Sequence, residues 1–81
     1  MIIDLHNKTL KEAKKIVSEE IDKAIKLKLS QIRIIYGFNS GNTLKNYFTT
    51  IKHYDLTKVT SIFEVSNNNG EAIINLKVSL K

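Results

Sequence analysis

The chain changes its apolar period within one stretch, residues 32–45, and this change constrains the fold more than any other feature. The stretch opens with a β-branched run, Ile32, Ile34 and Ile35. Such a run is typical of a strand that helices cover. A polar segment with Gly37 and Gly41 follows, and apolar residues then recur at helical spacing, at Leu44, Tyr47, Phe48 and Ile51. The stretch predicts a buried strand, a glycine loop and a helix in succession.

The predicted loop has the chemistry of an anion site. The first turn of a helix leaves N–H groups without intrahelical partners, and the helix dipole adds partial positive charge there, so phosphate is a common occupant. Gly37 and Gly41 can adopt positive φ angles. A loop that only turns the chain and caps the helix is the alternative. The residues predicted to contact phosphate or nucleic acid are Arg33, Gly37, Phe38, Asn39, Ser40, Gly41 and Lys45.

A short strand is predicted at residues 2–6, where alternation puts Asp4 and His6 on the same face. Thr9 and Glu12 have the spacing of a capping box, which predicts a helix that begins at Leu10 and ends by residues 29–30. The lysines on the outer face of this helix are interspersed with acidic residues. They are interpreted as a solvated face, with a nucleic-acid-binding stripe as the alternative.

A strand, a helix and a strand in this order predict a right-handed crossover with the two strands parallel. The second strand is predicted at residues 31–36. Parallel strands place their carboxyl ends side by side, at the rim where open α/β sheets bind ligands. His6 and the segment from Tyr36 to Gly41 are therefore expected on one rim.

Two strands close the chain, at residues 58–65 and 71–81. The first is expected to place Val59, Ser61, Phe63 and Val65 on one face, and the second Ala72, Ile74, Leu76, Val78 and Leu80. Asn69-Gly70 is a hairpin signal. With a second helix at about residues 42–53, the order is βαβαββ. This predicts an α+β two-layer sandwich, a mixed four-stranded sheet with both helices on one face. The pattern leaves the strand order open.

Composition limits the functional classes. Eighty-one residues predict a single domain over residues 1–81. Without cysteine, disulfides and thiolate sites are excluded, and no apolar run approaches the about 20 residues of a membrane span. We therefore expect a cytoplasmic protein without a membrane partner. The net charge of +5 favours a polyanionic partner, and twelve of the thirteen basic residues are lysine, which suits phosphate contact better than reading of base edges.

Three motifs in this order resemble those of the small MutS-related (Smr) domain. The first is Asp4-Leu5-His6-Asn7, the second runs from Ile34 to Gly41, and the third from Gly70 to Leu76. The resemblance covers essentially the whole chain. Two departures stand out, because Tyr36 occupies the position of the histidine in the second motif and Asn7 that of the glycine in the first. The loop also has Phe38 and Asn39 where lysine and glycine are usual.

The resemblance implies a fold similar to the carboxyl-terminal domain of translation initiation factor three, and a nucleic-acid partner, RNA or DNA. It also implies DNA-nicking or RNA endonuclease activity, with which Smr domains are associated. These domains occur alone or in larger proteins of recombination, DNA repair and ribosome rescue. The candidate catalytic residues are Asp4, His6 and Tyr36. His6 would be the general acid or base, with Asp4 orienting it or binding a metal. The glycine-loop amides and Lys45 would stabilise the charge on phosphate.

Structural alternatives remain for some of these residues. Asp4 could pair with Arg33 on the uncovered side of the sheet or cap the loop. Tyr36 and Phe38 could stack on unpaired bases or cover the edge of the core. No tightly bound cofactor or metal is expected, which leaves open a loosely bound divalent ion. The competing functions are a non-catalytic nucleic-acid or ribosome-binding adaptor module and a protein-interaction domain.

Overall fold

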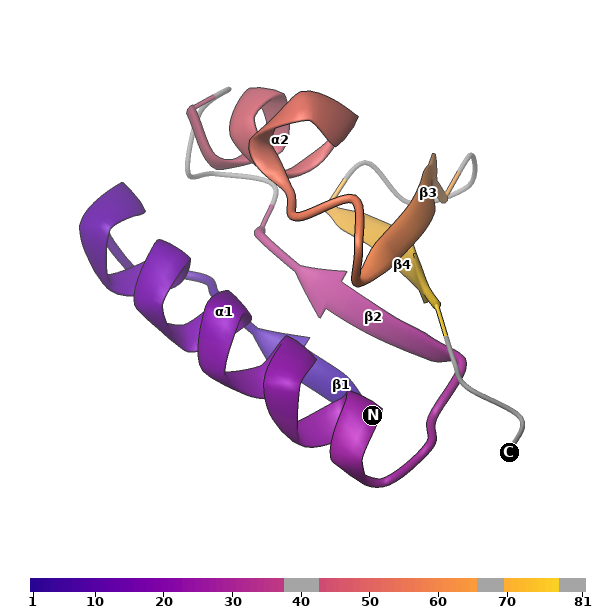
Figure 1. The fold of residues 1–81 in the computed structure, drawn as a ribbon. Coiled ribbons are helices and arrows are strands. Elements are labelled where there is room, and N and C mark those ends of the chain that lie inside the picture. Colours follow the sequence, from indigo (N-terminus) through magenta and orange to yellow (C-terminus); the bar gives the residue numbers. More distant parts are fainter. Residues whose placement is uncertain (38–42, 66–69, 78–81) are drawn as a thin grey trace.

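The structure, a computed structural model, describes residues 1–37, 43–65 and 70–77 (Figure 1). The predictions for Phe38, Asn39, Ser40 and Gly41, and those for Val78 and Leu80, lie outside the described residues. The elements are β1 (Ile2–Asp4), α1 (Leu10–Lys26), β2 (Gln31–Ile35), α2 (Thr43–Phe48), the 3-10 helix η1 (Ile51–His53), β3 (Val59–Glu64) and β4 (Glu71–Leu76). This order confirms the predicted βαβαββ fold.

The four strands form one mixed sheet in the order β1-β2-β4-β3. The β1 and β2 strands are parallel, as the crossover predicted, while β4 is antiparallel to both of its neighbours. Strand residues that face α1 and α2 are buried, including Ile3, Ile34 and Ile74, whereas Ile2 and Arg33 are exposed. Both helices therefore cover the same face (Figure 1). We call the uncovered side of the sheet the open face.

Helix α1 begins as the capping box predicted. The Thr9 hydroxyl accepts a hydrogen bond from the Glu12 amide at 3.2 Å, and the Glu12 carboxylate accepts one from the Thr9 amide at 2.9 Å. These bonds satisfy N–H groups that the first turn leaves without partners. The helix buries one stripe of small and branched residues, Ala13, Val17, Ile21 and Ala24.

The prediction of one helix over residues 42–53 is wrong. Helix α2 ends at Phe48, and η1 follows after Thr49 and Thr50. Both threonine hydroxyls donate to the carbonyl four residues earlier, at 2.6 Å, a bond that competes with regular helix geometry. Because the helix breaks here, Ile51 is exposed rather than in the core.

The prediction that Val59 and Phe63 share one face is also wrong. Val59 is buried, but the pairing of β3 with β4 is irregular between Val59 and Ser61. An extra residue in a strand reverses the alternation beyond it. Phe63 consequently pairs with Ile73 on the open face and is 59% exposed.

The core is one apolar cluster between the sheet and the two helices, and its largest buried side chains are those of Tyr36 and Phe48. The buried face of β4 is formed by Ala72, Ile74 and Leu76, as the alternation predicted. Within the part of the chain that the structure describes, no helix has the length and apolar character needed to cross a membrane.

Candidate functional site

The carboxyl ends of β1 and β2 lie side by side, as the parallel crossover predicted. Asp4 is paired with Ile35, and the Leu5 amide donates to the Ile35 carbonyl at 2.7 Å. This bond extends the pairing beyond the end of β1, so the chain leaves both strands at one rim. The rim is formed by Asp4 and His6 at the end of β1 and by Tyr36 and Gly37 directly after β2.

Asp4 and His6 form a hydrogen-bonded pair at this rim. One oxygen, Asp4 Oδ1, lies 2.5 Å from His6 Nδ1 and also accepts the His6 amide at 3.0 Å. An ionised carboxylate has only acceptors, so Nδ1 carries the hydrogen of this bond. The other ring nitrogen, Nε2, is then the proton acceptor of the neutral imidazole. The two side chains are 61% and 52% exposed, which leaves this nitrogen accessible from solvent.

The side-chain hydrogen bond from His6 lowers the pKa of Asp4 below its ordinary value of 3.8, and the His6 amide lowers it further. The Asp4 carboxylate is therefore ionised throughout the neutral and mildly acidic range. Since the folded-state pKa is depressed, any stability from the pair is fully present above pH 3.8 and is lost as the pH falls through the lower value. Asp4 thus acts as an acceptor that orients His6.

The turn after the pair explains why asparagine can replace the glycine of the first Smr motif at position 7. Asn7 has a φ angle of 63°. Glycine adopts this left-handed conformation without steric cost, and asparagine tolerates it better than other residues. The Lys8 amide closes the turn by donating to the Leu5 carbonyl at 3.1 Å. Asn7 therefore preserves the backbone that presents His6.

Replacement of Asn7 by valine is expected to lower the free energy of unfolding by about 1 kcal/mol, because a β-branched residue clashes in the left-handed region. Asn7→Gly is the matched control and should stay within about 0.5 kcal/mol of the wild type. Urea denaturation followed by circular dichroism measures both changes. Equal stabilities of the two variants would show that the turn does not need this φ angle.

Tyr36 lies in the core rather than on the surface of the rim. Its side chain is 1% exposed, and its hydroxyl donates to the Glu71 carbonyl at 3.1 Å. Burial raises the pKa of Tyr36 above 10, and the negative charges of Glu64 and Glu71 raise it further. Of the two positions that the sequence left open, stacking on bases or covering the core, the structure therefore has the second. This geometry argues against proton transfer by Tyr36.

Gly37 adopts a φ angle of 88°, which confirms that this position uses the freedom of glycine. Its amide donates to the Gly70 carbonyl at 3.3 Å, next to the Tyr36 amide, which donates to the same oxygen at 2.8 Å. The expected role of the Gly37 amide as a phosphate donor conflicts with this bond. The Gly37 amide instead forms a hydrogen bond that joins the segment after β2 to Gly70, the residue before β4.

The two predicted cationic contacts both lie next to carboxylates. Arg33 Nε is 3.3 Å from Glu71 Oε2 on the open face, and Lys45 Nζ is 3.8 Å from Glu64 Oε1. Arg33 therefore has Glu71 as its partner, while Asp4 has His6, so the predicted alternative of an Asp4–Arg33 pair is wrong. The Arg33 side chain remains 47% exposed.

The open face carries an exposed aromatic ring, Phe63, which alternation predicted on the same face as the buried Val59. The strand registers put Ile2, Arg33, Ile73 and Phe63 in one row across all four strands. Phe63 and Ile2 are 59% and 64% exposed. Strict alternation did not reveal that Phe63 is exposed, because no residue pattern in β3 marks the irregularity that turns this side chain outward. Among the described residues, no cluster of three or more histidine or acidic side chains could hold a metal ion.

The sequence and the fold of this chain are both similar to those of known proteins. The family model of the Smr domain matches residues 3–73. Among solved structures, the crystal structure of the Smr domain of Thermus thermophilus MutS2 is similar, with a TM-score of 0.76 and 22% sequence identity. The match covers 94% of this chain and 96% of that chain. At this identity the likeness shows the fold. A comparison with curated proteins gives no match.

Proposed function

This chain belongs to the Smr domain family, a family of nucleic-acid-binding domains, and on that premise we propose that it binds nucleic acid at the rim of β1 and β2. The observation that carries the proposal is the pairing of His6 with Asp4. Asp4 holds the imidazole in one orientation and one protonation pattern, with Nε2 accessible. When protonated, this fixed imidazole can donate a charge-assisted hydrogen bond from Nε2 to a backbone phosphate.

The charges and rings around the pair support a polyanion with unpaired bases. Lys8 lies close enough to Asp4 for its charge to lower the pKa of that carboxyl, so the rim carries a cation beside His6. On the open face, Arg33 and Phe63 lie in one row, separated by Ile73. Aromatic rings and guanidinium groups are the surfaces on which single-stranded bases stack. The net charge of +5 adds general attraction to phosphate.

The catalytic form of this proposal is endonucleolytic cleavage with His6 as the general base. With RNA, Nε2 takes the proton of a 2′-hydroxyl, the 2′-oxygen bonds to phosphorus, and the bond from phosphorus to the 5′-oxygen breaks. The departing oxygen then receives a proton from the His6 imidazolium or from water. Asp4 stabilises the imidazolium during this step. With DNA, water replaces the 2′-hydroxyl as the nucleophile.

One observation favours the alternative, a non-catalytic nucleic-acid-binding module. Efficient cleavage uses an acid as well as a base. Tyr36, at the position of the family's second histidine, is buried and its hydroxyl is bonded to the Glu71 carbonyl. The other histidine, His53, belongs to η1 and packs against Tyr47 rather than at the rim. A single histidine at the rim suffices for holding a phosphate.

Binding is tested by fluorescence anisotropy with labelled single-stranded RNA, single-stranded DNA and duplex DNA. With about three phosphate contacts, the affinity for single strands should fall about 20-fold between about 50 and 200 mM salt. Arg33→Gln should weaken binding by about tenfold, because it removes both the charge and the stacking surface.

Lys15→Gln is the matched control for this experiment, because it removes one charge from an exposed position on α1. Wild-type affinity in this variant, together with the loss in Arg33→Gln, would support the open face and rim. An equal loss in both variants would instead favour the lysine stripe of α1. Affinity that does not change with salt would contradict nucleic-acid binding altogether.

A further inference from the structure

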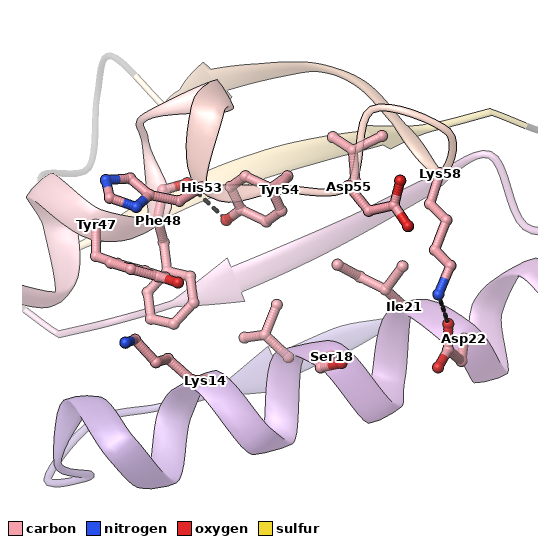
Figure 2. Close-up of a pocket in the computed structure, with 12 residues that line it drawn as sticks. Lys14, Ser18, Ile21, Asp22, Tyr47, Phe48, His53, Tyr54, Asp55 and Lys58 are labelled. Carbon is pink, nitrogen blue, oxygen red and sulfur yellow. Dashed lines mark hydrogen bonds and ion pairs between the residues drawn. The ribbon is translucent and has the colours of Figure 1, made fainter.

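A pocket lies on the helical side of the sheet, opposite to the open face. It has a volume of about 290 Å³ and is bounded by α1 on one side and by residues 47–59 on the other (Figure 2). This volume is just below the range for small-molecule sites, roughly 300–1,000 Å³. The pocket therefore fits one small organic group rather than a folded partner.

The floor of the pocket is apolar and well packed. Val17 and Ile21 of α1, with Phe48 and Val59, line it and are each at most 6% exposed. A small inorganic ion would lose its hydration against such a floor without gaining partners. A flat organic ring would bury its faces there at no such cost.

Aromatic rings form the wall opposite α1. Tyr54 is held in place by a hydrogen bond from its hydroxyl to the Phe48 carbonyl at 2.7 Å. Tyr47 packs edge-on against Phe48, with ring centroids 5.0 Å apart, and against His53 at 4.2 Å. Because these contacts position the rings before any ligand arrives, binding costs little ordering of side chains.

The two ends of the pocket carry different charged side chains (Figure 2). At one end Lys14 Nζ lies 4.8 Å from the centre of the Tyr47 ring. No carboxylate among the described residues forms an ion pair with Lys14. At the other end are two carboxylates, Asp22, which pairs with Lys58 at 2.6 Å, and Asp55, whose Oδ1 accepts two bonds from Thr57.

We propose that this pocket binds a nucleotide, with the base on the apolar floor between α1 and the Tyr54 ring and the phosphate at Lys14. The base offers a flat aromatic face to the apolar walls and N–H donors to the carboxylates, while the phosphate supplies the anion that Lys14 lacks. The occupant is either a free mononucleotide or one unpaired nucleotide of a bound strand. This site is separate from the His6 rim and does not depend on it.

The test is a titration of the ¹⁵N-labelled full chain with AMP, with adenosine and with a short oligoadenylate, followed by amide chemical shifts. AMP at up to about 10 mM should shift the amides of Ser18, Tyr47 and Tyr54, since millimolar affinity suits a pocket this small. Adenosine should bind about tenfold more weakly than AMP, because it lacks the charge-assisted contact with Lys14.

Two exposed variants locate the site, because neither alters the core. Ser18→Phe fills the mouth of the pocket and should abolish the shifts, while Lys14→Gln should weaken AMP about tenfold and make AMP and adenosine equal. Lys15→Gln, one residue along the same helix, is the control and should match the wild type. A dispersed amide spectrum checks that each variant is folded.

Shifts with AMP support a mononucleotide site, and shifts with oligoadenylate alone support an unpaired nucleotide of a strand. The proposal is overturned if neither ligand shifts the pocket amides, if Ser18→Phe binds like the wild type, or if adenosine equals AMP in the wild type. The amides of residues 5–8 report the rim separately. If oligoadenylate shifts only the rim amides, the proposed function is supported and this inference is refuted. If it shifts only the pocket amides, this inference is supported and binding at the rim is refuted.

Discussion

Replacement of Phe48 by alanine is expected to lower the free energy of unfolding by about 3–5 kcal/mol. Phe48 is 1% exposed and contacts the rings of Tyr47 and Tyr54, so its removal leaves a cavity that these neighbours cannot close. An 81-residue chain has a total stability of about 4–12 kcal/mol. The variant should therefore lose at least about a quarter of the total stability, and at the lower end of this range it would be unfolded at 25 °C.

Phe63→Ala is the matched control, because it deletes the same side chain from an exposed position on the open face. It should change stability by no more than about 0.5 kcal/mol. Urea titration with far-UV circular dichroism compares the two. A larger loss in Phe63→Ala than in Phe48→Ala would contradict the irregularity in β3 and return Phe63 to the face of Val59, as simple alternation predicted.

Replacement of His6 by alanine is expected to reduce the rate of phosphodiester cleavage by about 10²- to 10⁴-fold if the domain is an endonuclease. The loss follows from removal of the only imidazole that the described structure places at the rim. Labelled RNA and nicked or branched DNA are incubated with purified protein, and products are resolved on denaturing gels.

Asp4→Asn tests the orientation of His6 in the same assay. The asparagine amide can donate to Nδ1, which would favour the hydrogen on Nε2 and remove the base. Its cleavage rate should fall nearly as far as in His6→Ala, with folding unchanged. Glu19→Gln, an exposed carboxylate on α1, serves as the control and should retain the wild-type rate. If wild type and His6→Ala leave all substrates equally intact, the endonuclease form fails and the binding module remains.

Much of the site could be predicted because its signals are local. Alternation in residues 2–6 placed Asp4 and His6 on one face, and the crossover rule placed them beside Tyr36 and Gly37. The capping box at Thr9 fixed the start of α1 within one residue. Each of these signals depends on bonds or spacings that lie within a few positions along the chain.

The roles of Tyr36 and Arg33 could not be predicted in this way. The Tyr36 hydroxyl bonds to Glu71, 35 residues away, and Arg33 pairs with the side chain of the same residue. Both contacts depend on β4 lying beside β2. The sequence motifs named Tyr36 as a site residue, but they carried no information about whether its ring points into the core.

By itself, the sequence determined the order of the elements, the parallel pair that forms the rim, and the presence of Asp4 and His6 there, because period and capping are local properties. Only the tertiary structure decided the strand order, the outward position of Phe63, the break after Phe48 and the pocket between α1 and residues 47–59. These features depend on which surfaces meet in space. A one-residue change of register or a threonine bond to the backbone is enough to alter them, and neither has a periodic signature in the chain.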